Sequence, residues 1–533
     1  MRELSALSMA TEPSAIMSFV AEPAERRRRS GGHEARRRQR TDTARSVIAG
    51  VRREIPPYVL LRDEGLELIE LRADDLLQEI GVEFRGDEGA LALWRDVGAD
   101  VQGERVRFDK GMVRKIIADT AQATFTQHAR NPARSVELGG DNVVFAPAYG
   151  MPFVRDLDRG RRYGSIEDFE NIVKLTFSTP WLHHSGGTVC EPVDLPANKR
   201  HLDMVYAHIR WSDKPFMGSV TTPARAEDSI DMARIVFGEE FVDQNCVIMG
   251  NINMNSPLVY DRAMSGSLRA YARANQCPVI VPFVLGGATA PVTMAGAITQ
   301  SLAEVLVGAA LGQLERPGSP AVFGNFLTSV DLRSGSPTFG TPEPALGSFV
   351  AAQLARRVGM PIRCSGGFTS SKVPDAQAMQ ETVNSLNTAI LCGANFVLHA
   401  AGWLEGALTI SYEKLVLDAD YLGALHVFLK GLSFDDNAFA MDAFREVAPG
   451  THFFGCAHTL ANYETAFYES ELSDTQSFEN WRDAGEEDSV VRANRKWKRM
   501  LAEYEAPLLD SPIDEALQEF MATRKGSMPD TWH

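Results

Sequence analysis

Residues 361–375, Pro-Ile-Arg-Cys-Ser-Gly-Gly-Phe-Thr-Ser-Ser-Lys-Val-Pro-Asp, carry the clearest signal of how this chain folds. A short apolar run opens into small residues, continues as a Ser/Thr/Lys loop and reaches Pro-Asp at the start of a long helical pattern. Barrel strands end in site-forming loops of this kind, because small residues admit a ligand and a proline in the first helical turn costs no hydrogen bond. The stretch therefore predicts a strand, a binding loop and a helix, in that order.

The same alternation extends in both directions along the chain. Eight apolar, β-branched runs are each followed by an amphipathic stretch of helical length, which predicts a (β/α)8 (TIM) barrel. The runs are 143–148, 181–190, 216–222, 246–253, 279–285, 321–326, 362–366 and 396–403. A doubly wound open sheet is the competing α/β fold, but no GxGxxG motif follows the first run, which disfavours its nucleotide-binding version.

The flanking segments divide the chain further. We expect a flexible basic arm over residues 1–45, a helical N-terminal extension over 46–140, the barrel over 141–432 and a C-terminal helical cap over 433–533. Residues 25–40 are rich in arginine, which is typical of an arm for an acidic partner or of a solvated or intersubunit tail. We favour the tail.

The amino-acid composition limits the cellular compartment and the kinds of partner that we expect for this protein. A net charge of −16 argues against general nucleic-acid binding, and no run of about 20 apolar residues predicts a membrane span. The six cysteines form no CxxC pair and no His/Cys/Glu set has zinc spacing, so we expect reduced thiols, no bound metal and a cytoplasmic protein.

The site of a barrel lies where its strands end, and those ends are rich in glycine and aromatic residues. The glycines, which make room for a large group to approach the backbone, are Gly286, Gly287, Gly366 and Gly367. Phe326, Phe368 and Trp403 fall at the same ends, where aromatic rings can cage a quaternary ammonium through cation–π attraction. Core packing is the commoner role for each ring, except for Phe368 in its polar loop.

Three further residues near the strand ends are candidates. Glu405 is placed to attract a cationic substrate, or alternatively to cap the next helix. Arg363 suits bidentate contact with a carboxylate if its side chain faces the cavity rather than the helices. His399 lies on a strand, where a hydrogen-bonded core histidine is the more common outcome.

Residues 361–375 closely resemble a segment of the trimethylamine:corrinoid methyltransferase family. Members that act on trimethylamine carry pyrrolysine there, in Gly-Thr-Pyl-Ser-Asp-Ala-Lys-Val-Pro-Asp. Phe368 stands at the pyrrolysine position, and the Lys-Val-Pro-Asp of residues 372–375 matches as it stands. Further collinear motifs, which extend the resemblance over most of the chain, lie at 156–158, 290–296, 329–331, 403–405 and 450–459.

The resemblance implies a TIM barrel that moves a methyl group from a methylated amine to the Co(I) centre of a cobamide on a separate corrinoid protein. Phe368 cannot form the pyrrolysine adduct, so the expected donor is a small quaternary amine such as glycine betaine. Phe326, Phe368, Trp403 and His399 would then bind the amine, Glu405 would steer it, and the four glycines would face the cobamide.

Three other functions stay open, together with the expectation of a homo-oligomer. They are a barrel enzyme of different chemistry such as a hydrolase or lyase, a true trimethylamine methyltransferase, and a noncatalytic betaine-binding protein. The first would need no corrinoid partner, and the last would bind ligand without transferring a methyl group.

Overall fold

The computed structural model describes residues 47–532, and its centre is one curled sheet of eight strands. Across the sheet these are β1 (Val51–Arg52), β7 (Asn142–Phe145), β19 (Phe396–Leu398), β18 (Ile362–Ser365), β15 (Val322–Gly324), β13 (Cys277–Ile280), β11 (Ile248–Ile252) and β10 (Phe216–Met217). The strands from β7 to β10 run parallel, and β1 pairs antiparallel with β7. The α/β alternation is therefore confirmed. The predicted basic arm of residues 1–45 lies outside the described residues.

The second predicted strand, residues 181–190, forms no ladder. Its backbone still bridges the two ends of the parallel set, because His183 N donates to Phe145 O and Met217 N donates to Gly186 O. Gly186 has φ of 92°, a left-handed conformation that interrupts a regular strand. The structure thus shows a curled sheet with an irregular bridging segment, and a closed eight-stranded barrel stays a prediction.

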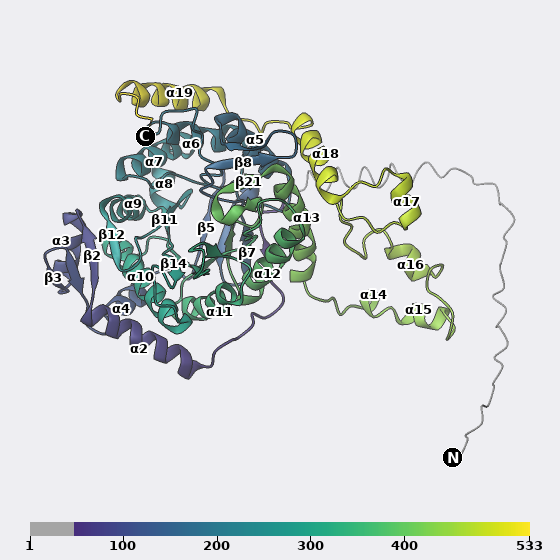
Figure 1. The fold of residues 1–533 in the computed structure, drawn as a ribbon, viewed down its shortest axis with the longest axis horizontal. Helices are drawn as coiled ribbons and strands as arrows, with labels where there is room; N and C mark the ends of the chain where they lie inside the picture. Colours follow the sequence, from purple (N-terminus) through teal and green to yellow (C-terminus); the bar gives the residue numbers. More distant parts are fainter. Residues whose placement is uncertain (1–46, 533) are drawn as a thin grey trace, which may run out of the picture. The chain divides into compact units, whose positions relative to one another are not determined.

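Helices cover the outer face of the sheet (Figure 1). They are α5 (Ile166–Ser178), α6 (Arg200–Trp211), α7 (Pro223–Phe237), α8 (Glu239–Gln244), α9 (Arg262–Arg273), α10 (Met294–Glu315), α11 (Pro342–Arg357), α12 (Ala376–Cys392) and α13 (Tyr412–Leu429). Asp375 caps α12 by accepting from Ala378 N, as the Pro-Asp signal predicts. By length and composition α10 could cross a membrane, but 78% of its most apolar window is buried, so it is a core helix.

The inner face of the sheet has its own apolar core. Met249, Val279, Val322 and Phe396 from four strands pack there. The hairpin of β5 (Thr124–Gln127) and β6 (Val136–Gly139) contributes buried side chains to the same cluster. One end of the sheet interior is therefore filled, which leaves the carboxyl ends of the strands for a site.

The N-terminal extension is only partly helical, which corrects the expectation for residues 46–140. It contains α2 (Asp63–Glu79), α3 (Glu88–Asp96) and α4 (Met112–Thr120). It also contains β2 (Val82–Arg85), β3 (Asp100–Gln102) and β4 (Arg105–Arg107), which share a sheet with β12 (Val259–Asp261). Val82 and Phe84 are buried and alternate with Glu83, a period-two pattern that the longer helical pattern obscured.

Short strands and loops surround the carboxyl ends of the main sheet. One set is β14 (Phe283–Gly286), β16 (Phe326–Val330) and β17 (Pro337–Thr338), and the other is β8 (Phe153–Asp156), β9 (Gly160–Tyr163), β20 (Trp403–Leu404) and β21 (Thr409–Ser411). They carry two of the predicted site residues, Phe326 on β16 and Trp403 on β20, to the cluster described below.

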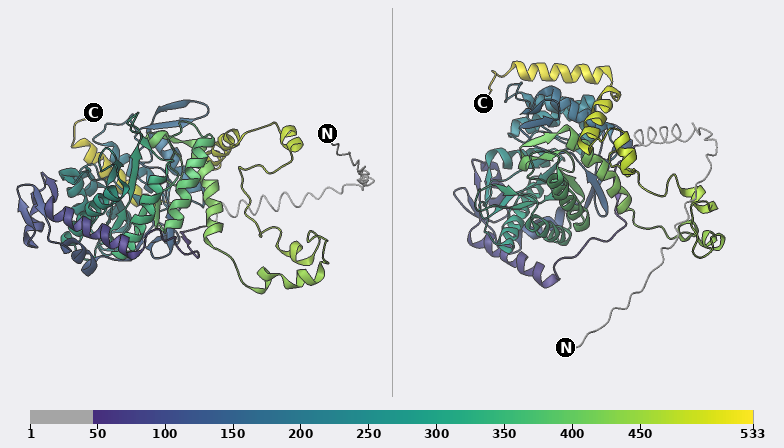
Figure 2. Two further views of the ribbon diagram at one scale, coloured as in Figure 1. Left: turned by 60° about the horizontal axis from the view of Figure 1, so that its bottom comes forward. Right: turned by 45° about the vertical axis from the view of Figure 1, so that its right-hand side comes forward.

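The C-terminal region is helical but does not cap the sheet throughout. It contains α14 (Asp436–Phe439), α15 (Met441–Glu446), α16 (Ala457–Asn462), α17 (Phe478–Asp483), α18 (Ser489–Ala502) and α19 (Ser511–Gly526). α18 packs on α13, and α19 packs on α7. The helices α14 to α16 instead stand away from the sheet and its covering helices in both views of Figure 2.

Candidate active site

Four predicted site residues meet in one aromatic cluster at the strand ends. The ring of Phe368 lies 4.6 Å from Trp403, 5.2 Å from Phe326 and 5.6 Å from His399, measured between centroids. Phe339, which the sequence did not single out, joins them at 5.0 Å from Phe368 and 5.3 Å from Trp403. Phe368 is only 5% exposed, so its polar loop delivers a buried ring.

The cluster is closed on itself. Centroids 4.6–5.7 Å apart are those of directly packed rings. The adjoining cavity, which Phe326, Phe339 and Phe368 line together with Asn325 and Ser365, measures about 20 Å³, room for about one water molecule. A trimethylammonium group would therefore bind only if at least one ring moved.

Hydrogen bonds hold the loops that carry these rings. Trp403 Nε1 donates to Thr369 O at 3.0 Å, and Phe368 N donates to Ser385 Oγ at 3.1 Å. The Thr369 hydroxyl donates to Glu381 of α12 at 2.6 Å. The loop after β18 is thus fixed both to α12 and to the indole that it faces.

A buried ion pair supports both ring-bearing loops from behind. Lys414 Nζ lies 2.5 Å from Asp418 Oδ1, and both side chains are fully buried. Lys414 also donates to Thr382, whose hydroxyl donates to Gly367 O, while Asp418 accepts from Gly402 N. Burial lowers the pKa of Lys414 and raises the pKa of Asp418. The pair therefore connects the backbone beside Phe368 to the backbone beside Trp403.

Arg363 faces the cluster rather than the helices. Its guanidinium lies 5.5 Å from the Phe326 ring, donates to Asn325 O at 2.8 Å and is 3.4 Å from His399 Nδ1. The residue is 0% exposed and its Nε has no partner. Within residues 47–532 no carboxylate lies at ion-pair distance from it, so this is a buried cation without a counter-charge.

Burial sets the protonation of this pair of residues. It lowers the pKa of Arg363 to about 9, so the guanidinium stays charged at pH 7. Burial, together with Arg363, lowers the pKa of His399 well below its usual value. The neutral imidazole accepts at Nδ1 from Arg363, and the same atom lies 3.2 Å from Ser365 Oγ. His399 also has φ of 64°, a conformation uncommon outside glycine that concentrates at functional sites.

Glu405 does not present a free carboxylate to the rings. It accepts from Arg161 Nε at 2.7 Å and from Thr409 Oγ1 at 2.7 Å. Burial opposes ionisation, but these hydrogen bonds outweigh it and lower the pKa of Glu405. Arg161 also stacks on Phe153 at 3.5 Å. The predicted steering role of Glu405 stays a prediction, because Arg161 already engages its carboxylate.

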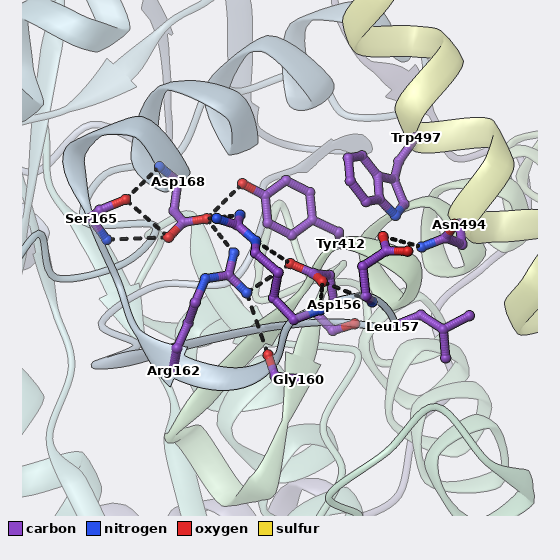
Figure 3. A network of polar contacts seen from close by, with 12 residues as sticks. Asp156, Leu157, Gly160, Arg162, Ser165, Asp168, Tyr412, Asn494 and Trp497 are labelled. Carbon is purple, nitrogen blue, oxygen red and sulfur yellow. Dashed lines mark hydrogen bonds and ion pairs between the residues drawn. The ribbon is translucent and has the colours of Figure 1, made fainter.

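The hairpin that carries Arg161 is anchored by a polar network (Figure 3). Arg162 contacts Asp156 at 2.7 Å and Asp168 at 2.6 Å, and Tyr412 donates to Asp168 at 3.0 Å. Both aspartates are nearly fully buried. The hairpin β8–β9 is therefore held on α5 and α13, which fixes the position of the Arg161–Glu405 pair.

The four predicted cofactor-facing glycines fall into two groups. A Cβ on Gly366 would lie 2.4 Å from Leu386, and one on Gly367 would lie 2.4 Å from His399 O, so these two permit close packing. Gly287 is exposed at the rim with φ of 93°, and Gly286 precedes it at the end of β14. Gly286 is buried, so only Gly287 of this pair lies open at the rim. A role of the two glycines toward a cobamide stays a prediction, and the inner pair has a packing reason of its own.

A parallel α/β sheet with a buried ring-and-guanidinium cluster at its carboxyl edge is the arrangement of an enzyme that binds a small organic ligand. The trimethylamine methyltransferase (MTTB) family model matches residues 28–529. The chain therefore belongs to this family and is a methyltransferase.

Three methyltransferases with named donors are similar to this chain over most of its length. The chain is 42% identical over 471 residues to a glycine betaine methyltransferase of Desulfitobacterium hafniense (strain Y51). The aligned region covers 88% of this chain and 98% of the relative. The chain is 27% identical to a proline betaine:corrinoid methyltransferase of Eubacterium limosum, with 88% and 98% covered. It is also 27% identical to trimethylamine methyltransferase MttB of Desulfitobacterium hafniense (strain DSM 10664 / DCB-2), with 86% and 92% covered.

Proposed function

We propose that this methyltransferase takes a methyl group from a quaternary amine that bears a carboxylate, glycine betaine or a close analogue. The observation that carries the proposal is Arg363, a buried guanidinium that touches the aromatic cluster and has no carboxylate of residues 47–532 at ion-pair distance. In glycine betaine one methylene group joins the ammonium to the carboxylate. The betaine would place its carboxylate on Arg363 and its ammonium among the rings.

The same arrangement argues against trimethylamine and against a simple tetraalkylammonium ion. An unpaired cation beside the rings repels a second cation unless that cation brings a negative group. Phe368 offers no electrophile for a neutral amine. Two relatives are named as a glycine betaine methyltransferase and a proline betaine:corrinoid methyltransferase, and these names support a betaine as the donor.

The methyl acceptor is proposed to be a corrinoid on a separate protein, which supplies Co(I) as the nucleophile. The C–N bond breaks, its electron pair stays on nitrogen, and the amine leaves as a neutral tertiary amine. The rings of Phe368 and Trp403 exclude water from the ammonium and orient one N-methyl group. Glu405, held by Arg161, contributes negative potential at the mouth of the site.

The rim fits the approach of a large planar group. Gly287 and Ala288 are exposed there, and Phe283, Val292 and Leu332 are exposed apolar side chains of the same region. We propose that this rim meets the corrinoid protein, that residues 183–186 complete the barrel, and that the enzyme works in the cytoplasm.

The test is anaerobic methylation of Co(I) cobalamin, followed by its absorbance, with glycine betaine, trimethylamine and tetramethylammonium as donors. We expect transfer from the betaine alone and a large loss in Phe368→Ala. Transfer from trimethylamine alone, or full betaine activity in Phe368→Ala, would contradict the proposal.

A further inference from the structure

One ring of the aromatic cluster comes from a segment at the surface of the protein. Phe339 is 2% exposed, whereas every other residue from 331 to 343 is exposed or half-buried. Phe368 and Trp403 instead follow stretches of buried residues at the ends of β18 and β19. A surface segment thus inserts a single buried side chain into the site.

The backbone that carries this ring is held at both ends but not in the middle. Thr338 pairs with Ser329 of β16, and the hydroxyl oxygens of Thr338 and Thr341 lie 3.3 Å apart. Between these two threonines, neither Phe339 nor Gly340 forms a backbone hydrogen bond to another residue of 47–532. Phe339 can therefore change its position while β17 and α11 stay in place.

The other three rings of phenylalanine and tryptophan are more firmly held. The backbone of Phe368 donates to α12 at 3.1 Å, and the indole of Trp403 donates to the loop after β18 at 3.0 Å. Phe326 belongs to β16, which pairs with β14 on one side and with β17 on the other. Within the described chain, Phe339 is thus the ring whose displacement breaks no hydrogen bond of its own residue.

The position of the Phe339 ring is enclosed by the other three. Its centroid lies 5.0 Å from Phe368, 5.3 Å from Trp403 and 6.4 Å from Phe326. Three aromatic rings around one position attract a quaternary ammonium group by cation–π interaction. A trimethylammonium group is smaller than a phenyl ring, and the adjoining cavity adds about 20 Å³. The volume of the displaced ring therefore suits such a group.

We infer that the Phe339 ring occupies, in the free enzyme, the place that the ammonium group of the donor takes in the complex. The identity of the occupant rests on the proposed function, whereas the displacement of Phe339 does not. Gly406 lies beside the ring, and a Cβ there would be 3.4 Å from Phe339 Cε2. This edge of the ring is thus covered by a half-buried glycine that has no side chain. Until a donor arrives, Phe339 keeps water away from the three rings.

The first experiment follows two rings by fluorine NMR of the full-length protein. 4-Fluorophenylalanine is placed at position 339 or, as the matched control, at position 368. The titrant is whichever of glycine betaine, trimethylamine and tetramethylammonium is active in the methyl-transfer assay. A dissolved gadolinium chelate broadens the signal of a fluorine that solvent reaches. We expect both fluorines to be protected in the free enzyme, and only the fluorine at 339 to become accessible at saturation with the donor.

The second experiment measures the Kd of the same donor by calorimetry. Phe339→Ala should bind about tenfold more tightly, because it removes a closed state that leaves about 10% of the enzyme competent to bind. Phe368→Ala should bind more weakly, since this ring contacts the bound ammonium. The control is Phe349→Ala, a half-buried ring of α11 that packs on Tyr58 outside the cluster, and its Kd should equal that of the wild type.

The outcomes separate this inference from the proposed function. A fluorine at 339 that stays protected in the saturated enzyme would overturn the inference, and so would weaker binding by Phe339→Ala. Displacement of the ring by trimethylamine, with no effect of glycine betaine, would keep the displaced ring and refute the betaine donor. A protein that takes none of the three donors would contradict both.

Discussion

Replacement of Arg363 by methionine separates the two roles that one buried cation plays. In the free enzyme the guanidinium lowers the stability of the fold, because it is fully buried and no carboxylate of residues 47–532 lies at ion-pair distance from it. In the complex it is the counter-charge that we assign to the betaine carboxylate. Arg363→Met should therefore preserve or raise stability while it removes betaine activity.

The magnitudes follow from the structure. Burial lowers the pKa of Arg363 from 12.5 to about 9, which corresponds to about 5 kcal/mol against the buried charge. Methionine leaves Asn325 O without its donor, at a cost of about 1–3 kcal/mol, so the free energy of unfolding should not fall. Loss of a charge-assisted contact to the substrate carboxylate costs about 2–5 kcal/mol, and about 3 kcal/mol within that range is roughly two orders of magnitude in kcat/KM.

The assay compares glycine betaine with tetramethylammonium, which has the ammonium group but no carboxylate. Arg363→Met should lower kcat/KM for the betaine about a hundredfold and leave or improve any transfer from tetramethylammonium. The control is Arg72→Met on the exposed face of α2, where the side chain is 67% exposed. A betaine kcat/KM that stays at the wild-type value would refute the assignment, and a fall in Tm of the variant would make Arg363 a structural residue.

Three further predictions concern the support of the site. Asp418→Asn should lower the free energy of unfolding by about 3–5 kcal/mol, because Lys414 stays buried without its partner; urea titration measures this, and Lys414→Met/Asp418→Leu should lose less. His208 and His426 are buried and neutral, and burial lowers the pKa of each from 6.5 to about 4. Each neutral histidine contributes up to about 3 kcal/mol to the free energy of unfolding. This contribution is complete above pH 6.5 and disappears as the pH falls toward 4. A Tm that stays constant over this pH range would contradict the prediction. Glu405→Gln should lower betaine kcat/KM about tenfold and Arg161→Gln should not, whereas equal losses would make their contact purely structural.

Local sequence was sufficient for the parts of the fold that local physics determines. The apolar runs at β18 and β19 and the Pro-Asp cap of α12 are short-range signals, and each appears where the pattern predicts it. The run at 181–190 failed as a regular strand because Gly186 adopts a left-handed conformation. Its backbone nevertheless bridges β7 and β10, so the error concerns regularity rather than position.

The chemistry of the site depended on distant pairs that spacing does not reveal. Arg161 and Glu405 are 244 residues apart, and nothing near Glu405 shows that its charge is already engaged. The ion pair of Lys414 and Asp418 has helical i,i+4 spacing, which is typical of an exposed pair, and only the fold shows that it is buried. Phe339 carried no signal, since it reaches the cluster from a loop between β17 and α11.

Under the proposed function, the closed cluster and the guanidinium of Arg363 together explain how the site would select its methyl donor. Rings in direct contact must separate to admit an ammonium group, which exposes apolar surface that only a well-fitting ligand covers again. Separation of Phe368 from Trp403 alone gains nothing for a ligand without a negative group, because the cation at Arg363 then faces the incoming charge. A carboxylate removes that repulsion at the moment the rings open. The proposed selectivity for a betaine would thus follow from two costs in the free enzyme, the contact between the rings and the missing counter-charge of Arg363, because a betaine offsets both when it binds.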